Sequence, residues 1–170
     1  MVLTRSELIT SLQSEVRILL HLAGKVSPSN VDYRPTAKQR SVGELVQYLS
    51  FMGPTIVRYA LAEPPDVTIW TDAEAAAKGR SFDESVAEIG RHSAQYAALL
   101  GEVTDAKFRT EFTDWEGKQT TVGSFLVNLV LSGAAAYRTQ LFVYLKASGL
   151  ERLDSSNLWT GVDSPEAVKA

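Results

Sequence analysis

Apolar residues recur every three or four positions along four long stretches of the chain, with polar residues between them. This spacing places the apolar side chains on one face of an α-helix and predicts amphipathic helices over residues 6–26, 42–61, 82–100 and 121–147. Three of these stretches begin with a Ser or Thr followed three residues later by Glu, which is the pattern of a capping box. The pairs are Thr4 and Glu7, Ser41 and Glu44, and Ser81 and Glu84.

Prolines and one alternating segment interrupt the helical pattern. Pro54 lies inside the second stretch and is expected to kink or restart that helix. Residues 108–113 alternate apolar and polar positions, and Glu116 and Gly117 follow as a turn, which predicts a short extended segment or hairpin. Four helices with one longer crossover predict an all-α, antiparallel four-helix bundle. We expect residues 1–170 to form a single domain whose tail, residues 150–170, places a tryptophan against the bundle.

Composition narrows the possible partners. Hydrophobic residues make up 45% and charged residues 22% of the chain, as in soluble globular proteins. A net charge of −3 offers no basic field for nucleic acid or for an acidic membrane surface. The chain has no cysteine, no signal-peptide pattern and no apolar run long enough to span a bilayer. We therefore expect a cytoplasmic protein without nucleic-acid or membrane partners and without thiolate chemistry of its own.

Two stretches carry a resemblance to a known family. "DYRPTAKQRSVGELVQYLSFMG" leads into the second predicted helix, and "WEGKQTTVGSFLVNLVLSGAAAYRTQLFVYLKASG" covers the fourth. Both resemble the DinB-like (YfiT-type) four-helix family. The resemblance implies a four-helix bundle in which one histidine of the second helix and two of the fourth bind a divalent metal. Family enzymes of this kind are metal-dependent transferases and isomerases that use a thiol, or hydrolases.

The three positions that the resemblance assigns to metal ligands are Tyr48, Gly133 and Tyr137, and none is a histidine. Glycine offers no side chain, and a tyrosine would have to lose a proton whose ordinary pKa is about 10. Metals of this class prefer neutral imidazole nitrogens or carboxylates. The sequence therefore predicts no metal and no cofactor. The histidines present are His21 and His92, of which His92 is expected on the surface.

A pocket is the main alternative to a metal site. Tyr48, Tyr137 and the small residues 133–136 either line a cavity or refill the space with packed rings. Asn128, in an apolar surrounding, either anchors a neighbouring helix or faces the same cavity. Arg138 is expected to pair with a carboxylate such as Glu44 or Asp114. The candidate ligand-binding residues are thus Tyr48, Asn128, Gly133, Tyr137 and Arg138.

Three functions remain open at this point. The first is a DinB-like protein without the metal site and without the family's catalysis, which binds a small molecule in a tyrosine-lined central pocket. The second is a metal- or thiol-dependent transferase or hydrolase with rearranged ligands, drawing on His21 and Glu44. The third is a homodimer built from exposed helix faces, with Val57 and Tyr59 as candidate contacts. Asp114 and Trp115 are candidates for the rim of a site.

Overall fold

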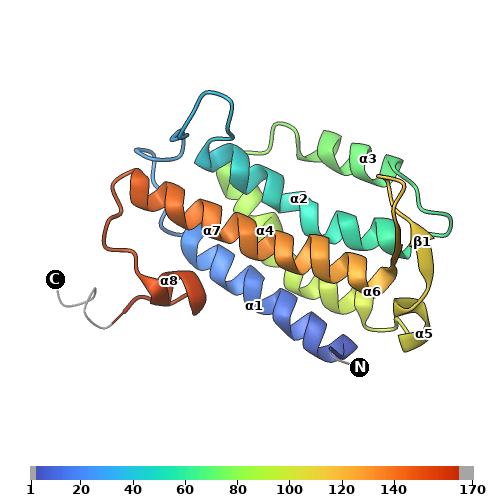
Figure 1. Cartoon of the computed structure of the whole chain (residues 1–170). Helices are drawn as coiled ribbons and strands as arrows, with labels where there is room; N and C mark the ends of the chain where they lie inside the picture. The colour runs from blue at the N-terminus through green and yellow to red at the C-terminus, as the bar shows by residue number, and fades with distance from the viewer. Residues whose placement is uncertain (1–2, 165–170) are drawn as a thin grey trace.

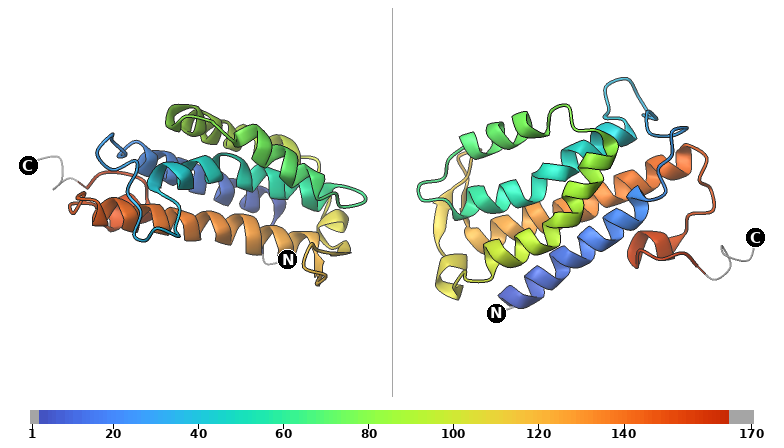
Figure 2. Two further views of the ribbon diagram at one scale, coloured as in Figure 1. Left: turned by 90° about the horizontal axis from the view of Figure 1, so that it is seen from above. Right: turned by 180° about the vertical axis from the view of Figure 1, so that it is seen from behind.

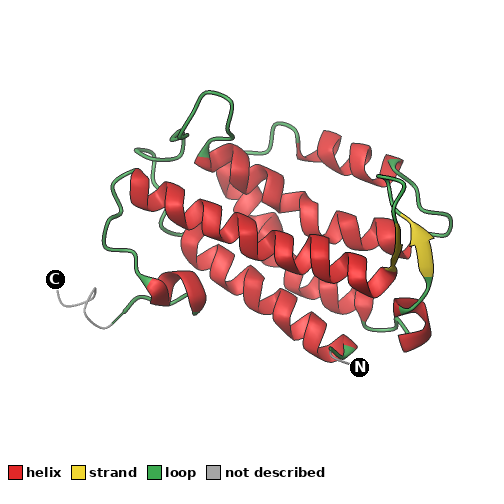
Figure 3. Ribbon diagram, viewed as in Figure 1, coloured by secondary structure: helices red, strands yellow, loops and turns green. Residues whose placement is uncertain are grey.

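The computed structural model describes residues 3–164 as an all-α bundle of four long helices with one small hairpin (Figures 1 and 3). The first three long helices are α1 (Arg5–Ala23), α2 (Val42–Leu61) and α4 (Phe82–Leu100). The fourth is continuous through α6 (Val122–Phe125), the π-helical segment η1 (Leu126–Leu131) and α7 (Ser132–Ala147). All three predicted capping boxes form, and the all-α bundle prediction is confirmed.

An unpredicted helix sets the direction of the chain through the bundle. Helix α3 (Thr68–Ala77) lies along the outside of α2 and returns the chain toward the start of that helix (Figure 2). As a result α2 and α4 run in the same direction, where the sequence predicted an antiparallel bundle, and Gln47 contacts Arg80 and Ser50 contacts His92 in matching order. The sequence pattern did not predict α3, because its N-cap residue, Val67, makes no side-chain capping bond and because the helix buries only Ala77.

Pro54 lies within a continuous α2 and does not end the helix. Proline has no backbone N–H, so the carbonyl of Ser50, four residues earlier, loses its helical donor. His92 of α4 replaces that donor, with 3.0 Å between its Nε2 and the Ser50 oxygen. His92 is only 3% exposed, so the expectation of a surface histidine is wrong. A buried carbonyl left open by proline explains why a polar ring lies inside the bundle.

Gly53 of α2 lies against the Tyr96 ring of α4. A Cβ at this position would overlap the hydroxyl oxygen of Tyr96 and lie 3.2 Å from Cζ of that ring. Tyr96 is itself buried at 3% exposure and has little room to move. The absence of a side chain at Gly53 therefore allows the two helices to pack at this distance.

We expect Gly53→Ala to lower the free energy of unfolding by about 1 kcal/mol. Overpacking costs about 1–3 kcal/mol, which the better helix propensity of alanine offsets by about 1 kcal/mol. Urea unfolding measures the change. Tyr96→Phe removes the clashing hydroxyl, so adding Gly53→Ala to that variant should cost nothing. An equal loss in both backgrounds would assign the effect to something other than this contact.

The hairpin between α4 and α6 is confirmed. Strands β1 (Glu111–Thr113) and β2 (Gln119–Thr121) pair in antiparallel register, with Phe112 opposite Thr120. The short α5 (Asp105–Phe108) precedes them. Phe112 and Trp115 pack on Phe125, at ring-centroid distances of 5.2 and 5.0 Å, and this attaches the hairpin to one end of the bundle.

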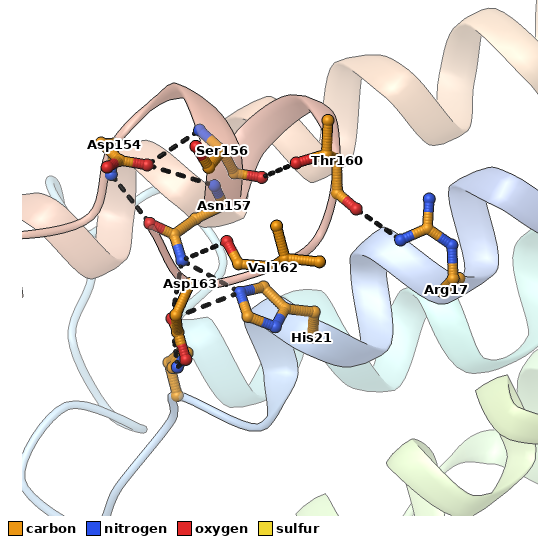
Figure 4. Close-up of polar contacts among 9 residues, drawn as sticks. Arg17, His21, Asp154, Ser156, Asn157, Thr160, Val162 and Asp163 are labelled. Carbon is orange, nitrogen blue, oxygen red and sulfur yellow. Dashed lines mark hydrogen bonds and ion pairs between the residues drawn. The ribbon is translucent and has the colours of Figure 1, made fainter. Parts of the chain in front are cut away.

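The C-terminal segment is attached to α1 by polar contacts. Helix α8 (Ser155–Trp159) buries Asn157, whose Nδ2 donates to His21 Nε2 at 3.0 Å and to Asp163 at 2.9 Å (Figure 4). Trp159 remains 66% exposed, but its ring does contact the bundle, because the Arg138 guanidinium of α7 lies 5.3 Å from the ring centroid. Residues 165–170 of the expected tail lie outside the described residues.

The residues predicted to form an exposed dimer contact are not on the protein surface. Val57 and Tyr59, the candidate dimer contacts, are buried at 0% and 3% exposure and belong to the core of the bundle. Both were therefore wrongly assigned to an exposed face. Across residues 3–164, no helix combines the length and the apolar character needed to cross a bilayer.

Candidate functional site

Helices α2 and α7 bring together Tyr48, Gly133 and Tyr137, the three positions that the resemblance assigned to metal ligands. The rings of Tyr48 and Tyr137 meet edge to face with their centroids 5.2 Å apart. Gly133 lies one turn before Tyr137 and faces Met52 of α2, whose Cε would be 3.6 Å from a Cβ at the glycine. The tyrosines and Met52 thus occupy the space between the helices at this level of the bundle.

Beside these residues the molecule is hollowed into a groove of about 750 Å³. We call it the aromatic groove. It lies between α2, the start of α3, the hairpin turn, η1 and α7, and no charged side chain lines it. Its lining residues are Tyr48, Met52, Ile56, Tyr59, Val67, Trp70, Thr71, Trp115, Asn128, Leu129, Ser132, Gly133, Ala136 and Tyr137.

Aromatic side chains form both ends of the groove. At one end Tyr48 and Trp70 approach with their centroids 6.1 Å apart, and the Arg40 guanidinium stacks on the Tyr48 ring at 4.1 Å. At the other end Trp115 lies 4.9 Å from Tyr59. Rings held by other rings have few alternative conformations, so both end walls are rigid surfaces.

The phenol of Tyr48 remains neutral. Burial raises the pKa of Tyr48 above its ordinary value, and the neighbouring Tyr137 hydroxyl raises it further. A neutral phenol both donates and accepts a hydrogen bond. The pair therefore provides directional polar groups in a wall that is otherwise apolar.

These donors do not fit the metal that the fold family implies. A raised pKa makes the Tyr48 phenolate harder to form, and Gly133 contributes no atom. Within the described part of the chain, no three His, Cys, Asp or Glu side chains group closely enough to hold an ion. His21 accepts from Asn157, while Glu44 binds Arg34 at 3.0 Å, so the two residues suggested as rearranged ligands have separate partners.

Asn128 and Arg138 differ from their expected environments. Asn128 is exposed on η1, lies at the rim of the groove and bonds Ser124 at 3.3 Å, so it is not a buried anchor. Arg138 is 4% exposed and lies outside the groove lining, with its Nε 3.3 Å from a Glu15 oxygen on α1. The correction for Arg138 follows from helix rotation, because residues 137 and 138 point to different faces of α7.

The two carboxylates expected to pair with Arg138 are used locally. Glu44 completes the capping box at Ser41, and Asp114 accepts from the backbone of Glu116 and Lys118 at 2.9 Å each. Trp115, which was expected at the rim of a site, does line the groove.

Sequence reasoning missed Met52 and Trp70 as lining residues. Met52 occurs in the predicted core stripe of the second helix, and nothing in its spacing distinguishes a groove wall from the core. Trp70 belongs to α3, which lacks a capping signal. The aromatic residue five positions after a double proline, in "PPDVTIW", was the available clue to a packed segment there.

Comparison with solved structures shows which known proteins this chain resembles. No protein-family model and no curated protein matches the sequence. A DinB-family protein from Exiguobacterium sibiricum matches with a TM-score of 0.69 at 20% identity, over 90% of this chain and 98% of that one. The DinB-like protein YjoA from Bacillus subtilis matches with a TM-score of 0.66 at 17% identity, over 84% of this chain and 92% of that one. The chain therefore has the fold of the DinB-like proteins, as its second and fourth helices indicated.

Proposed function

We propose that the chain is a DinB-like protein without the family's metal site, and that its aromatic groove binds an uncharged small molecule with a flat, ring-containing body. The observation that carries the proposal is the composition of the groove, which has five aromatic residues and no charged side chain among its lining residues. Its volume of about 750 Å³ lies within the 300–1,000 Å³ usual for small-molecule sites.

The lining of the groove disfavours charged ligands. A carboxylate or phosphate that entered the groove would lose water without meeting a cation among the lining residues, and such desolvation is costly. An uncharged ring stacks on Trp70 and Trp115 at little cost, and a hydroxyl or carbonyl on that ring can bond the phenols of Tyr48 and Tyr137. In this proposal the tyrosine pair orients the ligand and performs no metal-dependent chemistry.

Three matched probes test the charge preference: p-cresol, benzoate and benzylammonium, which share a ring and differ in charge. The chain has three tryptophans, of which Trp70 and Trp115 line the groove and Trp159 does not. We expect p-cresol to shift the indole N–H signals of Trp70 and Trp115 in NMR spectra and to leave that of Trp159 unchanged. Benzoate should bind at least about tenfold more weakly, which corresponds to about 1.4 kcal/mol. Tighter binding of either ion would overturn the assignment.

A substitution that fills the groove tests the same proposal from the side of the protein. Ala136 is exposed and lines the groove, whereas Ala147 is exposed on the same helix and lies outside the lining. We expect Ala136→Phe to weaken p-cresol binding about tenfold or more by occupying its space, and Ala147→Phe to have no effect. Equal losses in both variants would point to a change in the helix rather than to the groove.

The rim of the groove also favours a second hypothesis, a homodimer. Val67, Trp115 and Leu129 are 59%, 44% and 36% exposed, and all three line the groove. Apolar side chains gathered in this way are typical of protein contact surfaces. Sedimentation at micromolar concentration measures the mass, and Trp115→Ser should shift a dimer toward monomer. A monomer at these concentrations leaves the groove free for a small ligand.

A further inference from the structure

A second, smaller cavity lies across α3 from the aromatic groove. It measures about 190 Å³, which is room for a few water-sized groups at about 30 Å³ each. Its walls come from α2, from α3 at Ala73 and Ala76, and from α4 at His92. The aromatic groove uses Trp70 and Thr71 of α3 instead, so the two spaces have different α3 walls. In contrast to the groove, this cavity is lined by charged side chains.

His92 lines this cavity and bonds the Ser50 carbonyl through one of its two ring nitrogens. A carbonyl can only accept a hydrogen bond, so the contact with Ser50 places the ring proton on Nε2. Nδ1 then carries a lone pair, and within residues 3–164 no hydrogen bond is made to it. Burial lowers the pKa of His92 to about 4, which agrees with a neutral ring. Nδ1 is therefore an acceptor without a protein donor within residues 3–164.

Two arginines give the cavity a positive charge. Arg80 donates to Ser50 Oγ at 2.9 Å, which holds its guanidinium at the cavity wall, and Arg58 is exposed at the same cavity. Glu88 also lines the cavity, and its carboxylate is bound by Arg91 at 2.6 Å and by Gln95 at 2.8 Å. A guanidinium has five N–H donors, so Arg80 keeps several for a ligand.

We infer that this cavity is a binding site for a small oxyanion that also carries an O–H group, of the hydrogen phosphate class. The charged oxygens would accept from Arg58 and Arg80, for which bidentate pairing with oxyanions is favourable. The O–H would donate to Nδ1 of His92 and so satisfy the free acceptor. The site requires an oxyanion at the arginines and a proton donor at the histidine, and hydrogen phosphate offers both.

Inorganic phosphate and sulfate test the two requirements separately near pH 7. We expect phosphate to shift the His92 ring signals in NMR spectra with a saturable Kd of about 1 mM or below. Sulfate has the same shape and no O–H at this pH, so it should bind at least about tenfold more weakly. Absence of a saturable shift with phosphate up to about 20 mM would overturn the proposal. Equal binding of the two ions would overturn the role of Nδ1.

Matched variants separate this site from general surface charge. Arg58→Gln should weaken phosphate binding about tenfold or more, whereas Arg109→Gln, an exposed arginine outside the cavity, should leave it unchanged. Equal weakening by both variants would assign the binding to overall charge and overturn the site. Both positions are exposed, so neither substitution removes buried contacts. Circular dichroism confirms that the variants are folded before the titration is read.

Discussion

Replacing Arg138 with alanine will lower the free energy of unfolding by about 3–5 kcal/mol, the cost of leaving one member of a buried ion pair unpaired. Arg138 is 4% exposed, and its Nε lies 3.3 Å from a carboxylate oxygen of Glu15. Burial already raises the pKa of Glu15, and the Arg138 charge acts against that rise. Without the guanidinium, the carboxylate remains between α1 and α7 with no cation beside it.

Urea unfolding near pH 7 measures this loss. The exposed pair of Arg34 and Glu44 provides the matched control, because screened surface pairs contribute about 0–1 kcal/mol. Arg34→Ala should therefore have a small effect. The double variant Glu15→Leu with Arg138→Met should recover most of the loss, since apolar replacement of a buried pair is often neutral. A double variant as unstable as Arg138→Ala would show that the ion pair is not the cause.

Acidification will destabilise the protein through His92. The ordinary pKa of histidine is about 6.5, while burial lowers that of His92 to about 4 in the folded state. Between these values the unfolded chain binds a proton that the folded chain does not. Stability from this residue is therefore complete above about pH 6.5 and is lost as the pH falls toward 4. The loss amounts to about 2 kcal/mol between about pH 7 and pH 5.

His92→Gln isolates this contribution. The glutamine amide can still donate to the Ser50 carbonyl that Pro54 leaves open, but it does not titrate. Urea unfolding at several pH values between about 7 and 5 should show a steep decline for the wild-type chain and a shallower one for the variant. The remaining slope includes a contribution from His21, because burial also lowers the pKa of this residue. Identical slopes would contradict the assignment to His92.

The fold was largely predictable from local patterns. Each capping box is closed by side chains three residues apart, and each apolar stripe repeats every three or four residues, so both are legible in the chain itself. The hairpin followed from six alternating residues and a turn. Helix α3 was not predicted, because contact with α2 stabilises it and its N-cap residue, Val67, makes no side-chain capping bond.

The candidate site was also predicted only in part from the sequence. The resemblance placed Tyr48, Gly133 and Tyr137 together, and the structure does bring them together. The environment of Arg138 and the burial of His92 were predicted wrongly, because each depends on a partner from another helix. Glu15 lies 123 residues from Arg138 in the chain, and Ser50 lies 42 residues from His92.

The sequence by itself determined the all-α bundle, its capped helix starts and the absence of histidines at the positions that the resemblance assigns to metal ligands. Tertiary structure alone decided that Pro54 needs His92, that Arg138 faces Glu15, and that a groove lies open beside Gly133. The physical reason is the distance along the chain over which each interaction acts. Caps and periodicity act between residues a few positions apart, whereas a groove is the space left after distant side chains have packed.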